Sequence, residues 1–428
     1  MTRIRLMWVS DSPTCPTGMG TVGRHLLKRL NGTSRYEILA RGAGFQGEAY
    51  DPVEYPYPIE VSAPDNSDAN AMVRALERFL PQVTVIFGDV WRYLWLTALY
   101  EMRETHWVGY YPLDSGPIMR SCVPVLQRTE INVACAYYGQ ELMAEAVPDK
   151  PVEMIYLGVD TGVYRPLHDE TFGRRDGEAE ILGSGISVEG SDGPREGERS
   201  ASGSLHPSSF ILHPSEPEFV VGFVGRNQPR KQIPVLIKAF ARFCRDKPDA
   251  FLYLHTAPRD AGWDLPELIE RYGIKEQCAI SYRATSIKGI SDEEMNSIYN
   301  SMDVFVLPSN GEGFGMPILE AMAAGVPVVV TDSSASRELA MDRGERIRVA
   351  HWSTACQGNV EIAYPDEDDL VQILERLYRD PERRRQMAKR GREFAEQLDW
   401  DCIAAQWDAL LQKVAEMPYY RDPAEWKR

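Results

Sequence analysis

Two glutamates eight residues apart, Glu312 and Glu320, enclose a glycine-rich turn and the expected start of a short helix. Pro317 suits the first turn of that helix, so the helix begins directly after the turn. The first N–H groups of a helix have no intrahelical partners, and Gly313 and Gly315 let an anion approach the backbone closely. The spacing predicts a site where main-chain amides bind a phosphate or diphosphate beside two carboxylates.

The carboxylates also have a purely structural explanation. The helix dipole favours an acidic residue near a helix start, so either glutamate alone is compatible with a structural role. The helix that carries Glu320 is apolar on every side, however, through Ile318, Leu319, Ala321, Met322, Ala323 and Ala324. Such a helix is expected to be buried, and a buried carboxylate needs a defined partner. We therefore interpret the pair as functional, with the side chain of Glu320 leaning back toward the turn.

A basic turn follows the expected buried strand 219–224 and contains Arg226, Arg230 and Lys231. The next helix opens at Ile233, which places these cations at the carboxyl end of the strand. Fixed positive charge stabilises the negative charge that develops on a departing diphosphate. Arginine suits a forked contact and lysine a point contact. The alternative interpretation is a solvated basic turn without a ligand.

Gly18, Gly20 and Gly23 formally fit the Gly-x-Gly-x-x-Gly pattern of a dinucleotide site, which by itself is a weak signal. Such a site requires a tight turn after the first strand and an acidic residue at the end of the next one. Here several residues precede Gly18, and the next strand ends at Arg41. An NAD-dependent oxidoreductase therefore stays an alternative with little support.

Asp114 ends the expected strand 107–113, where its carboxylate points toward the ligand-binding edge of the first sheet. It could orient a bound hydroxyl group. A helix-capping or turn aspartate explains the same position equally well.

Size and composition limit the classes of protein to consider. The 428 residues, 43% of them hydrophobic, can form two domains with separate cores. The formal charge of −16 disfavours nucleic acid as a main partner, because non-specific binding to it depends on clustered positive charge. The seven cysteines are scattered singly and form no zinc-binding pattern, so we expect ordinary reduced thiols and no metal site.

The elements that must position these residues form two series of short apolar runs between helical patterns. The runs are 4–9, 83–87, 107–113, 132–136 and 154–157, and then 219–224, 250–254, 279–282, 303–307 and 326–331. This alternation predicts an α/β fold with two Rossmann-like, doubly wound parallel sheets. Ligands of such sheets bind at the carboxyl ends of the strands, so the two domains are expected to face each other across a cleft.

Four segments follow from this pattern. Residues 1–167 form the first domain, on the acceptor side, and residues 219–400 the second. Residues 168–218 are rich in Gly, Ser, Glu, Arg and Pro, and we expect a low-complexity linker that is disordered and has no binding role. Residues 401–428 are expected to contain a helix that crosses back to the first domain.

The N-terminus enters a strand at once and contains no apolar signal core. No later apolar run approaches a membrane-spanning length. We therefore expect a cytoplasmic protein, for which peripheral contact with a membrane stays open.

The turn and helix around the two glutamates resemble the Glu-x7-Glu motif of the group-one, retaining glycosyltransferases of the GT-B fold, which use nucleotide sugars. The resemblance implies that Glu312 contacts the donor sugar and Glu320 the ribose hydroxyls. Amides of the intervening turn, formed by Gly313, Phe314, Gly315, Met316 and Pro317, would hold the diphosphate. It also implies that Arg226 and Lys231 grip the diphosphate, that Gly18 and Gly20 close over the donor, and that Arg283 lies near the base.

Two departures from the family pattern concern the substrate. Many relatives have a histidine near Asp114 that contacts the donor sugar, and this chain has none there. The segment 331–338 lacks a glycine pair that is common in relatives. The donor sugar, the base and the acceptor are therefore not predicted, and Asp114 is a candidate replacement for the histidine.

The resulting hypothesis is a retaining glycosyltransferase that moves a sugar from a nucleoside diphosphate donor to the hydroxyl of a glycan, lipid or small molecule. The resemblance implies that neither a metal nor a cofactor is required, because cations and helix amides would hold the phosphates. The alternatives are a module that binds nucleotide sugars without catalysis, and the oxidoreductase built on the segment 18–23.

Overall fold

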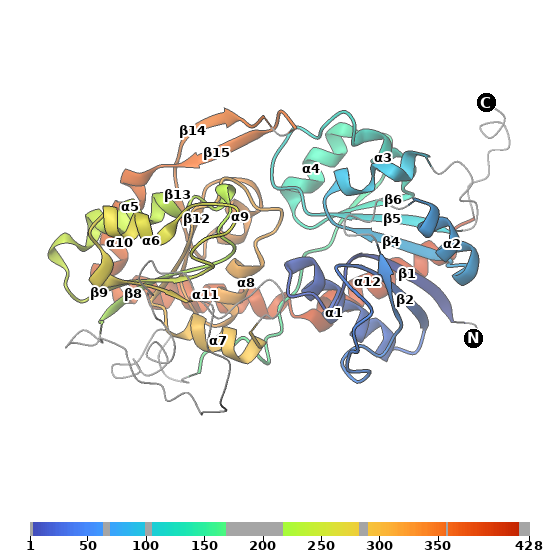
Figure 1. Ribbon diagram of the computed structural model, residues 1–428, viewed down its shortest axis with the longest axis horizontal. Coiled ribbons are helices and arrows are strands. Elements are labelled where there is room, and N and C mark those ends of the chain that lie inside the picture. Colours follow the sequence, from blue (N-terminus) through green and yellow to red (C-terminus); the bar gives the residue numbers. More distant parts are fainter. Residues whose placement is uncertain are drawn as a thin grey trace, which may run out of the picture.

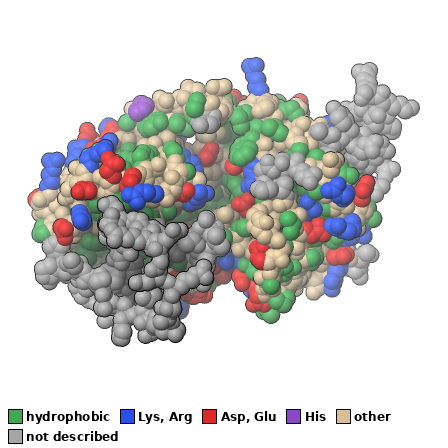
Figure 2. All heavy atoms as spheres, viewed as in Figure 1, with side chains coloured by type: hydrophobic (Ala, Val, Ile, Leu, Met, Phe, Trp, Pro, Cys, Tyr) green, Lys and Arg blue, Asp and Glu red, His purple; other side chains and the backbone are tan. Residues whose placement is uncertain are grey.

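The structure is a computed structural model that describes residues 3–62, 69–98, 105–167, 217–281, 290–356 and 358–418. Two lobes lie side by side, each built around a parallel sheet, and the space-filling view shows a hollow between them (Figures 1 and 2). The predicted linker, apart from residues 217 and 218, lies outside the described residues. Arg283 and residues 419–428 lie outside them as well.

The first lobe contains seven parallel strands, among the residues described, in the order β3-β2-β1-β4-β5-β6-β7. Its elements are β1 (Ile4–Asp11), α1 (Gly18–Gly32), β2 (Tyr36–Ala43), β3 (Ile59–Ser62), α2 (Ala69–Phe79), β4 (Val83–Phe87), η1 (Val90–Ala98), β5 (His106–Tyr111), α3 (Val123–Arg128), β6 (Ile131–Ala134), α4 (Tyr137–Ala146) and β7 (Val152–Met154). The strands β4, β5 and β6 are buried along their whole length. This burial explains why they read as continuous apolar runs in the sequence.

The second lobe contains six parallel strands, again among the residues described, in the order β10-β9-β8-β11-β12-β13. Its first elements are β8 (Phe219–Val224), η2 (Pro229–Lys231), α5 (Ile233–Phe243), η3 (Cys244–Asp246), β9 (Ala250–His255), α6 (Leu265–Arg271), η4 (Lys275–Gln277), β10 (Cys278–Ser281) and α7 (Asp292–Asn300). The series continues with β11 (Val304–Leu307), α8 (Met316–Ala323), β12 (Val328–Thr331), α9 (Ser334–Ala340) and β13 (Glu345–Ile347). Both sheets reverse their strand order beside their first strand, which creates a ligand-binding edge in each lobe.

An antiparallel hairpin follows the second sheet, formed by β14 (Val349–Thr354) and β15 (Glu361–Pro365). It reaches from the second lobe toward the first (Figure 1). There the amide of Glu361 donates to the carbonyl of Gly116 over 2.6 Å. The hairpin therefore connects the two lobes on one side of the molecule.

The chain ends in three helices: α10 (Glu367–Arg379), α11 (Pro381–Gln397) and α12 (Trp400–Ala415). α12 packs against α1 and β4 of the first lobe. The ring of Trp407 lies 4.8 Å from that of Tyr110 and 6.5 Å from that of Trp8. Buried aromatic side chains of this size contribute much of a core's stabilisation, so α12 belongs energetically to the first lobe.

Candidate active site

The helix α8 begins as the sequence predicts, directly after the glycine-rich turn. Gly315 precedes it with φ 97°, a left-handed conformation that glycine adopts without strain. The amides of residues 313–316 donate to no group in the part of the chain that the structure describes. Several N–H groups at the start of a buried helix are therefore available to an anion.

Glu312 lies beside these amides in a buried cluster of charges. Its Oε1 accepts from Lys231 Nζ over 2.6 Å and from Ser309 Oγ over 2.5 Å, and its Oε2 accepts from Arg230 Nη1 over 2.9 Å. Burial alone would raise the pKa of Glu312. The charges of Lys231 and Arg230, with the hydrogen bonds, outweigh burial and lower the pKa to about 2. Glu312 is therefore a fixed carboxylate at neutral pH.

Lys231 and Arg230 differ in what they present to a ligand. The side chain of Lys231 is 7% exposed, and burial lowers its pKa although Glu312 opposes this effect. The side chain of Arg230 is 41% exposed and also donates to the carbonyl of Gly311 over 3.1 Å. A ligand phosphate could therefore share both cations with Glu312.

Arg226 does not join this cluster. Its guanidinium is 67% exposed and pairs with Asp260 through two hydrogen bonds of 3.1 Å. The structure thus brings Lys231 together with Glu312, and Arg230, to which the resemblance assigned no role, joins them. The predicted contact of Arg226 with a diphosphate stays a prediction.

Glu320 projects from α8 and accepts a hydrogen bond of 2.8 Å from the hydroxyl of Tyr299. Burial raises its pKa to about 7, the negative charge of Asp292 adds to the rise, and the Tyr299 hydrogen bond and Arg24 partly offset it. The two glutamates of the motif therefore differ at neutral pH. Glu312 is ionised, whereas burial moves the pKa of Glu320 up toward neutral pH.

The first lobe closes against the turn of the second. A Cβ atom on Gly311 would lie 2.2 Å from the carbonyl oxygen of Asp114, and one on Gly313 would lie 2.5 Å from the backbone of Pro112. These glycines are needed because the segment after β5 packs directly on them. Asp114 is therefore placed beside the loop that carries Glu312.

The start of α1 also approaches the site. A Cβ on Gly18 would contact the sulfur of Met316 at 3.7 Å. Gly20 instead packs within its own loop, where a Cβ would lie 2.3 Å from the carbonyl oxygen of Cys15. In the turn of α8, Phe314 is buried and its ring lies 5.8 Å from that of Tyr156, while Pro317 occupies the first helical turn.

Replacing Gly313 by alanine tests this close approach. The new methyl group would collide with the backbone of Pro112 and hold the lobes apart. The rate of the sugar transfer expected from the sequence should then fall about 100-fold. Nucleotide release and small-angle X-ray scattering would measure the loss and the opening. Gly32→Ala is the matched control, because a Cβ there meets nothing within 4 Å. Equal activity of the two variants would contradict the predicted contact.

Two further acids lie at the same edge of the first sheet. Asp89 follows β4 and Asp11 ends β1, where it pairs with Arg92 at 2.9 Å. Burial, followed by the charge of Asp114, raises the pKa of Asp89 to about 6. The side chain of Asp114 accepts a hydrogen bond of 2.8 Å from Ser115.

The resemblance assigned no role to Arg230, and sequence reasoning did not identify Ser309 or Asp89. Asp89 carried the same signal as Asp114, because each comes soon after an expected buried strand. Ser309 lies three residues before Glu312, but its hydroxyl could not be paired with that carboxylate without the conformation of the turn. The described residues contain no cluster of His, Cys, Asp or Glu that could hold a metal ion. They also contain no helix long and apolar enough to cross a membrane.

Comparison with known proteins supports the interpretation of the second lobe. Residues 208–394 match the family model described as glycosyl transferases group 1. The MMP alpha-(1->4)-mannosyltransferase of Mycolicibacterium hassiacum is 31% identical over 196 residues, which cover 46% of this chain and 43% of that protein. The D-inositol 3-phosphate glycosyltransferase of Corynebacterium urealyticum is 31% identical over 208 residues, covering 48% and 45%. The matched part of this chain thus spans less than half the length of these relatives.

Solved structures match the fold over nearly the whole chain. Sucrose-phosphate synthase from Thermosynechococcus elongatus superposes with a TM-score of 0.71 at 16% identity, covering 96% of this chain and 99% of that one. The Anabaena protein HepE in complex with UDP-glucose gives a TM-score of 0.66 at 16% identity, covering 96% and 100%. The predicted fold of two parallel-sheet α/β domains is therefore confirmed. The predicted resemblance to group-one glycosyltransferases is confirmed by the family model, over residues 208–394.

Proposed function

We propose that this chain is a retaining glycosyltransferase that transfers a sugar from a nucleoside diphosphate donor to a hydroxyl acceptor. One observation carries the proposal: unpaired amides at the start of α8 lie beside the buried cluster of Glu312, Lys231 and Arg230. Amides and cations together suit a diphosphate, and a fixed carboxylate suits the hydroxyls of a sugar attached to it. The match to group 1 glycosyl transferases and the HepE complex with UDP-glucose support this choice of ligand.

In the proposed reaction the bond between the anomeric carbon and the diphosphate oxygen breaks as the acceptor oxygen bonds to that carbon. The charge that develops on the diphosphate is stabilised by the amides of residues 313–316, by Lys231 and by Arg230. Arg226 can join if its pair with Asp260 opens. The proton of the acceptor hydroxyl passes to a departing phosphate oxygen on the same face of the sugar. These residues supply the positive charge, so the proposal requires neither a metal nor a cofactor.

The acceptor is proposed to enter from the first lobe. Asp114 lies beside the loop of Glu312, and Asp89 shares its electrostatic environment. Both suit hydrogen bonds to a hydroxyl of a glycan, lipid or small molecule. The relatives include a mannosyltransferase and a D-inositol 3-phosphate glycosyltransferase. Their names suggest a mannose donor and D-inositol 3-phosphate as the first donor and acceptor to test. We also propose that Arg283 lies near the nucleotide base and that the protein is cytoplasmic. Peripheral contact with a membrane stays open.

A donor panel tests the function. The protein is incubated with UDP-, GDP- and ADP-sugars and with hydroxyl acceptors, and nucleotide release is measured. We expect acceptor-dependent release of nucleotide from one donor class. The transferred sugar should keep the α or β configuration that it had in the donor. Tight nucleotide binding without release would favour the binding module, and thermal stabilisation by NAD alone would favour the oxidoreductase.

The pH dependence of nucleotide binding tests the role of Glu320. If only its carboxylate binds the ribose hydroxyls, a pKa of about 7 predicts that affinity for the nucleotide rises about tenfold from pH 6 to pH 8. Calorimetric titration with UDP or GDP would measure it. Glu320→Gln should bind more weakly at pH 8 and lose this pH dependence. A rise with pH that persists in Glu320→Gln would assign the titration to another group.

The raised pKa of Glu320 also predicts how the stability of the protein depends on pH. Its native pKa of about 7 lies above the ordinary 4.5, so burial of the carboxylate lowers stability as pH rises from about 4.5 through 7. Glu320→Gln should therefore raise the melting temperature relative to the parent at pH 8 and less so at pH 5. Thermal unfolding at both pH values provides the measurement.

A further inference from the structure

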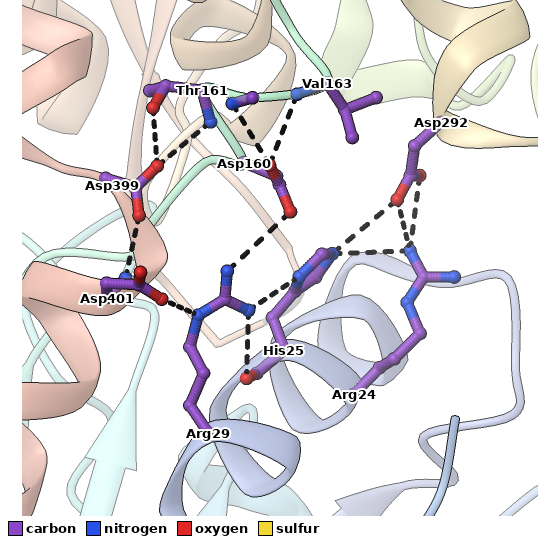
Figure 3. A network of polar contacts seen from close by, with 10 residues as sticks. Arg24, His25, Arg29, Asp160, Thr161, Val163, Asp292, Asp399 and Asp401 are labelled. Atoms are coloured by element: carbon purple, nitrogen blue, oxygen red, sulfur yellow. Dashed lines mark hydrogen bonds and ion pairs between the residues drawn. The ribbon is translucent and has the colours of Figure 1, made fainter. Parts of the chain in front are cut away.

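A charged cavity lies at the junction of the two lobes, away from the turn of Glu312. It has a volume of about 720 Å³ and is lined mainly by α1, the start of α7 and the first residues of α12. Figure 3 shows a network of ion pairs across it. The network contains residues that neither the sequence nor the proposed reaction uses.

One ion pair joins the two lobes directly. Arg24 Nη2, on α1 of the first lobe, lies 2.9 and 3.2 Å from the two carboxylate oxygens of Asp292, on α7 of the second. His25 approaches the same carboxylate at 3.6 Å and stacks on Trp400 with a ring separation of 5.3 Å. Burial raises the pKa of Asp292, but the contacts with His25 and Arg24 outweigh burial and lower it.

Two tyrosines lie between the carboxylate of Asp292 and that of Glu320. The hydroxyl of Tyr164 lies 3.4 Å from Asp292 Oδ1, and the ring of Tyr164 packs edge-on against that of Tyr299 at 6.2 Å. Tyr299 is completely buried and donates to Glu320. The second glutamate of the motif therefore lies at the inner end of a contiguous set of contacts that begins at the interface of the lobes.

We infer that Arg24 and Asp292 form a latch between the lobes that positions Glu320, so that closure of the lobes and binding of the donor nucleotide favour each other. This inference rests on the proposed function for its nucleotide. Arg24 and Asp292 are positioning residues here, because they act on the ligand through Glu320.

The coupling is electrostatic and its direction is fixed by the signs of the charges. In the closed state the positive charge of Arg24 counteracts the negative charge of Asp292. Arg24 thereby favours the carboxylate form of Glu320. Opening would remove Arg24 and leave Asp292, which raises the pKa of Glu320 and favours its neutral form. A nucleotide that binds the carboxylate must by linkage favour the closed state.

Most of the other charged and titratable groups around Glu320 lie outside the first lobe. The titratable and charged groups to consider are Tyr299 and Asp292 on α7, Arg24 and His25 on α1, Tyr164 in the segment between the lobes, and Arg392 on α11, which donates to the carbonyl of Ala323. Only Arg24 and His25 among them belong to the first lobe. A change at Arg24 therefore removes the positive charge that the closed state brings to Glu320 and Asp292.

The first test needs no ligand. Carboxyl ¹³C NMR titration of the full chain, with Glu320→Gln to assign the signal, is expected to give a midpoint near pH 7. Arg24→Met should raise this midpoint by about 0.5 pH unit, Asp292→Asn should lower it, and Arg24→Lys should restore most of the parent value. Arg29→Met is the matched control, because Arg29 lies on the same helix and pairs with Asp401 and Asp160; it contacts His25 at 3.3 Å, and no pair joins it to Asp292 among the described residues. Equal midpoints in the Arg24→Met and Arg29→Met variants would overturn the inference.

The second test uses UDP, GDP and ADP. Arg24→Met should weaken nucleotide binding about twofold at pH 7 and bind about as well as the parent at pH 9. Arg29→Met should bind like the parent at both pH values. A shifted NMR midpoint without binding of UDP, GDP or ADP would contradict the proposed function and keep the ion pair's effect on Glu320. Nucleotide binding with an unshifted midpoint would contradict the latch and keep the function.

Discussion

Replacing Glu312 by glutamine is expected to reduce sugar transfer by about 100- to 1,000-fold while the protein stays folded. The amide has the size of the carboxylate but no charge, so it cannot accept charge-assisted hydrogen bonds from Lys231 and a donor hydroxyl together. The positive charges of Lys231 and Arg230 would then lack their carboxylate partner, which changes how the diphosphate and the sugar are placed. Turnover of the donor identified in the panel measures the effect.

Glu396→Gln is the matched control for this experiment. Glu396 lies on the exposed face of α11, where it pairs with Arg392 and has a side chain 53% exposed. Its replacement should change neither nucleotide release nor affinity for the nucleotide. Full activity in Glu312→Gln would remove Glu312 from the proposed mechanism, whereas loss of activity in both variants would point to a general effect on folding.

Replacing Lys231 by methionine is expected to lower the free energy of unfolding by about 3–5 kcal/mol at pH 7. The substitution leaves Glu312 buried with only Arg230 as a charged partner, and an incompletely paired buried carboxylate is costly. Chemical denaturation at pH 7 measures the loss, and the double variant Lys231→Met with Glu312→Gln should recover part of it. Activity should be lost in both, because each lacks a cation at the diphosphate.

The pH dependence of this loss follows from Glu312. Its native pKa of about 2 lies below the ordinary 4.5, so its paired form stabilises the fold above pH 4.5, and this contribution is lost as pH falls toward 2. The difference between parent and Lys231→Met should therefore shrink at pH 4. Arg226→Met, which removes an exposed pair, should cost no more than about 1 kcal/mol. A loss of similar size in the two variants would show that burial of the Lys231 pair is not important.

The sequence was sufficient for the parts of the fold that depend on local pattern. The strands that are buried on both faces, such as β4 and β11, appear as short apolar runs, and α8 is bounded by Gly315 and Gly325. The edge strand β13 and the hairpin of β14 and β15 were not anticipated, because they are short, partly exposed and polar. Such strands acquire their structure from their neighbours.

The site was predictable where neighbours in the chain form it and less so where distant segments meet. The glycine-rich turn, Glu312 and Lys231 follow from spacing and residue type. The partner of Glu320, by contrast, is Tyr299, and the choice between Arg226 and Arg230 depends on which guanidinium the helical turn η2 directs at Glu312. The contacts of Gly311 and Gly313 with the first lobe depend on how two domains pack, which no local pattern specifies.

The most direct test of the account is a crystal structure of the protein with UDP or GDP, whichever binds. The account predicts that phosphate oxygens lie within hydrogen-bonding distance of amides in residues 313–316 and of Lys231 Nζ, with Glu320 at the ribose. A nucleotide bound with its phosphates elsewhere, while those amides stay unpaired and Lys231 stays bound to Glu312 alone, would contradict it.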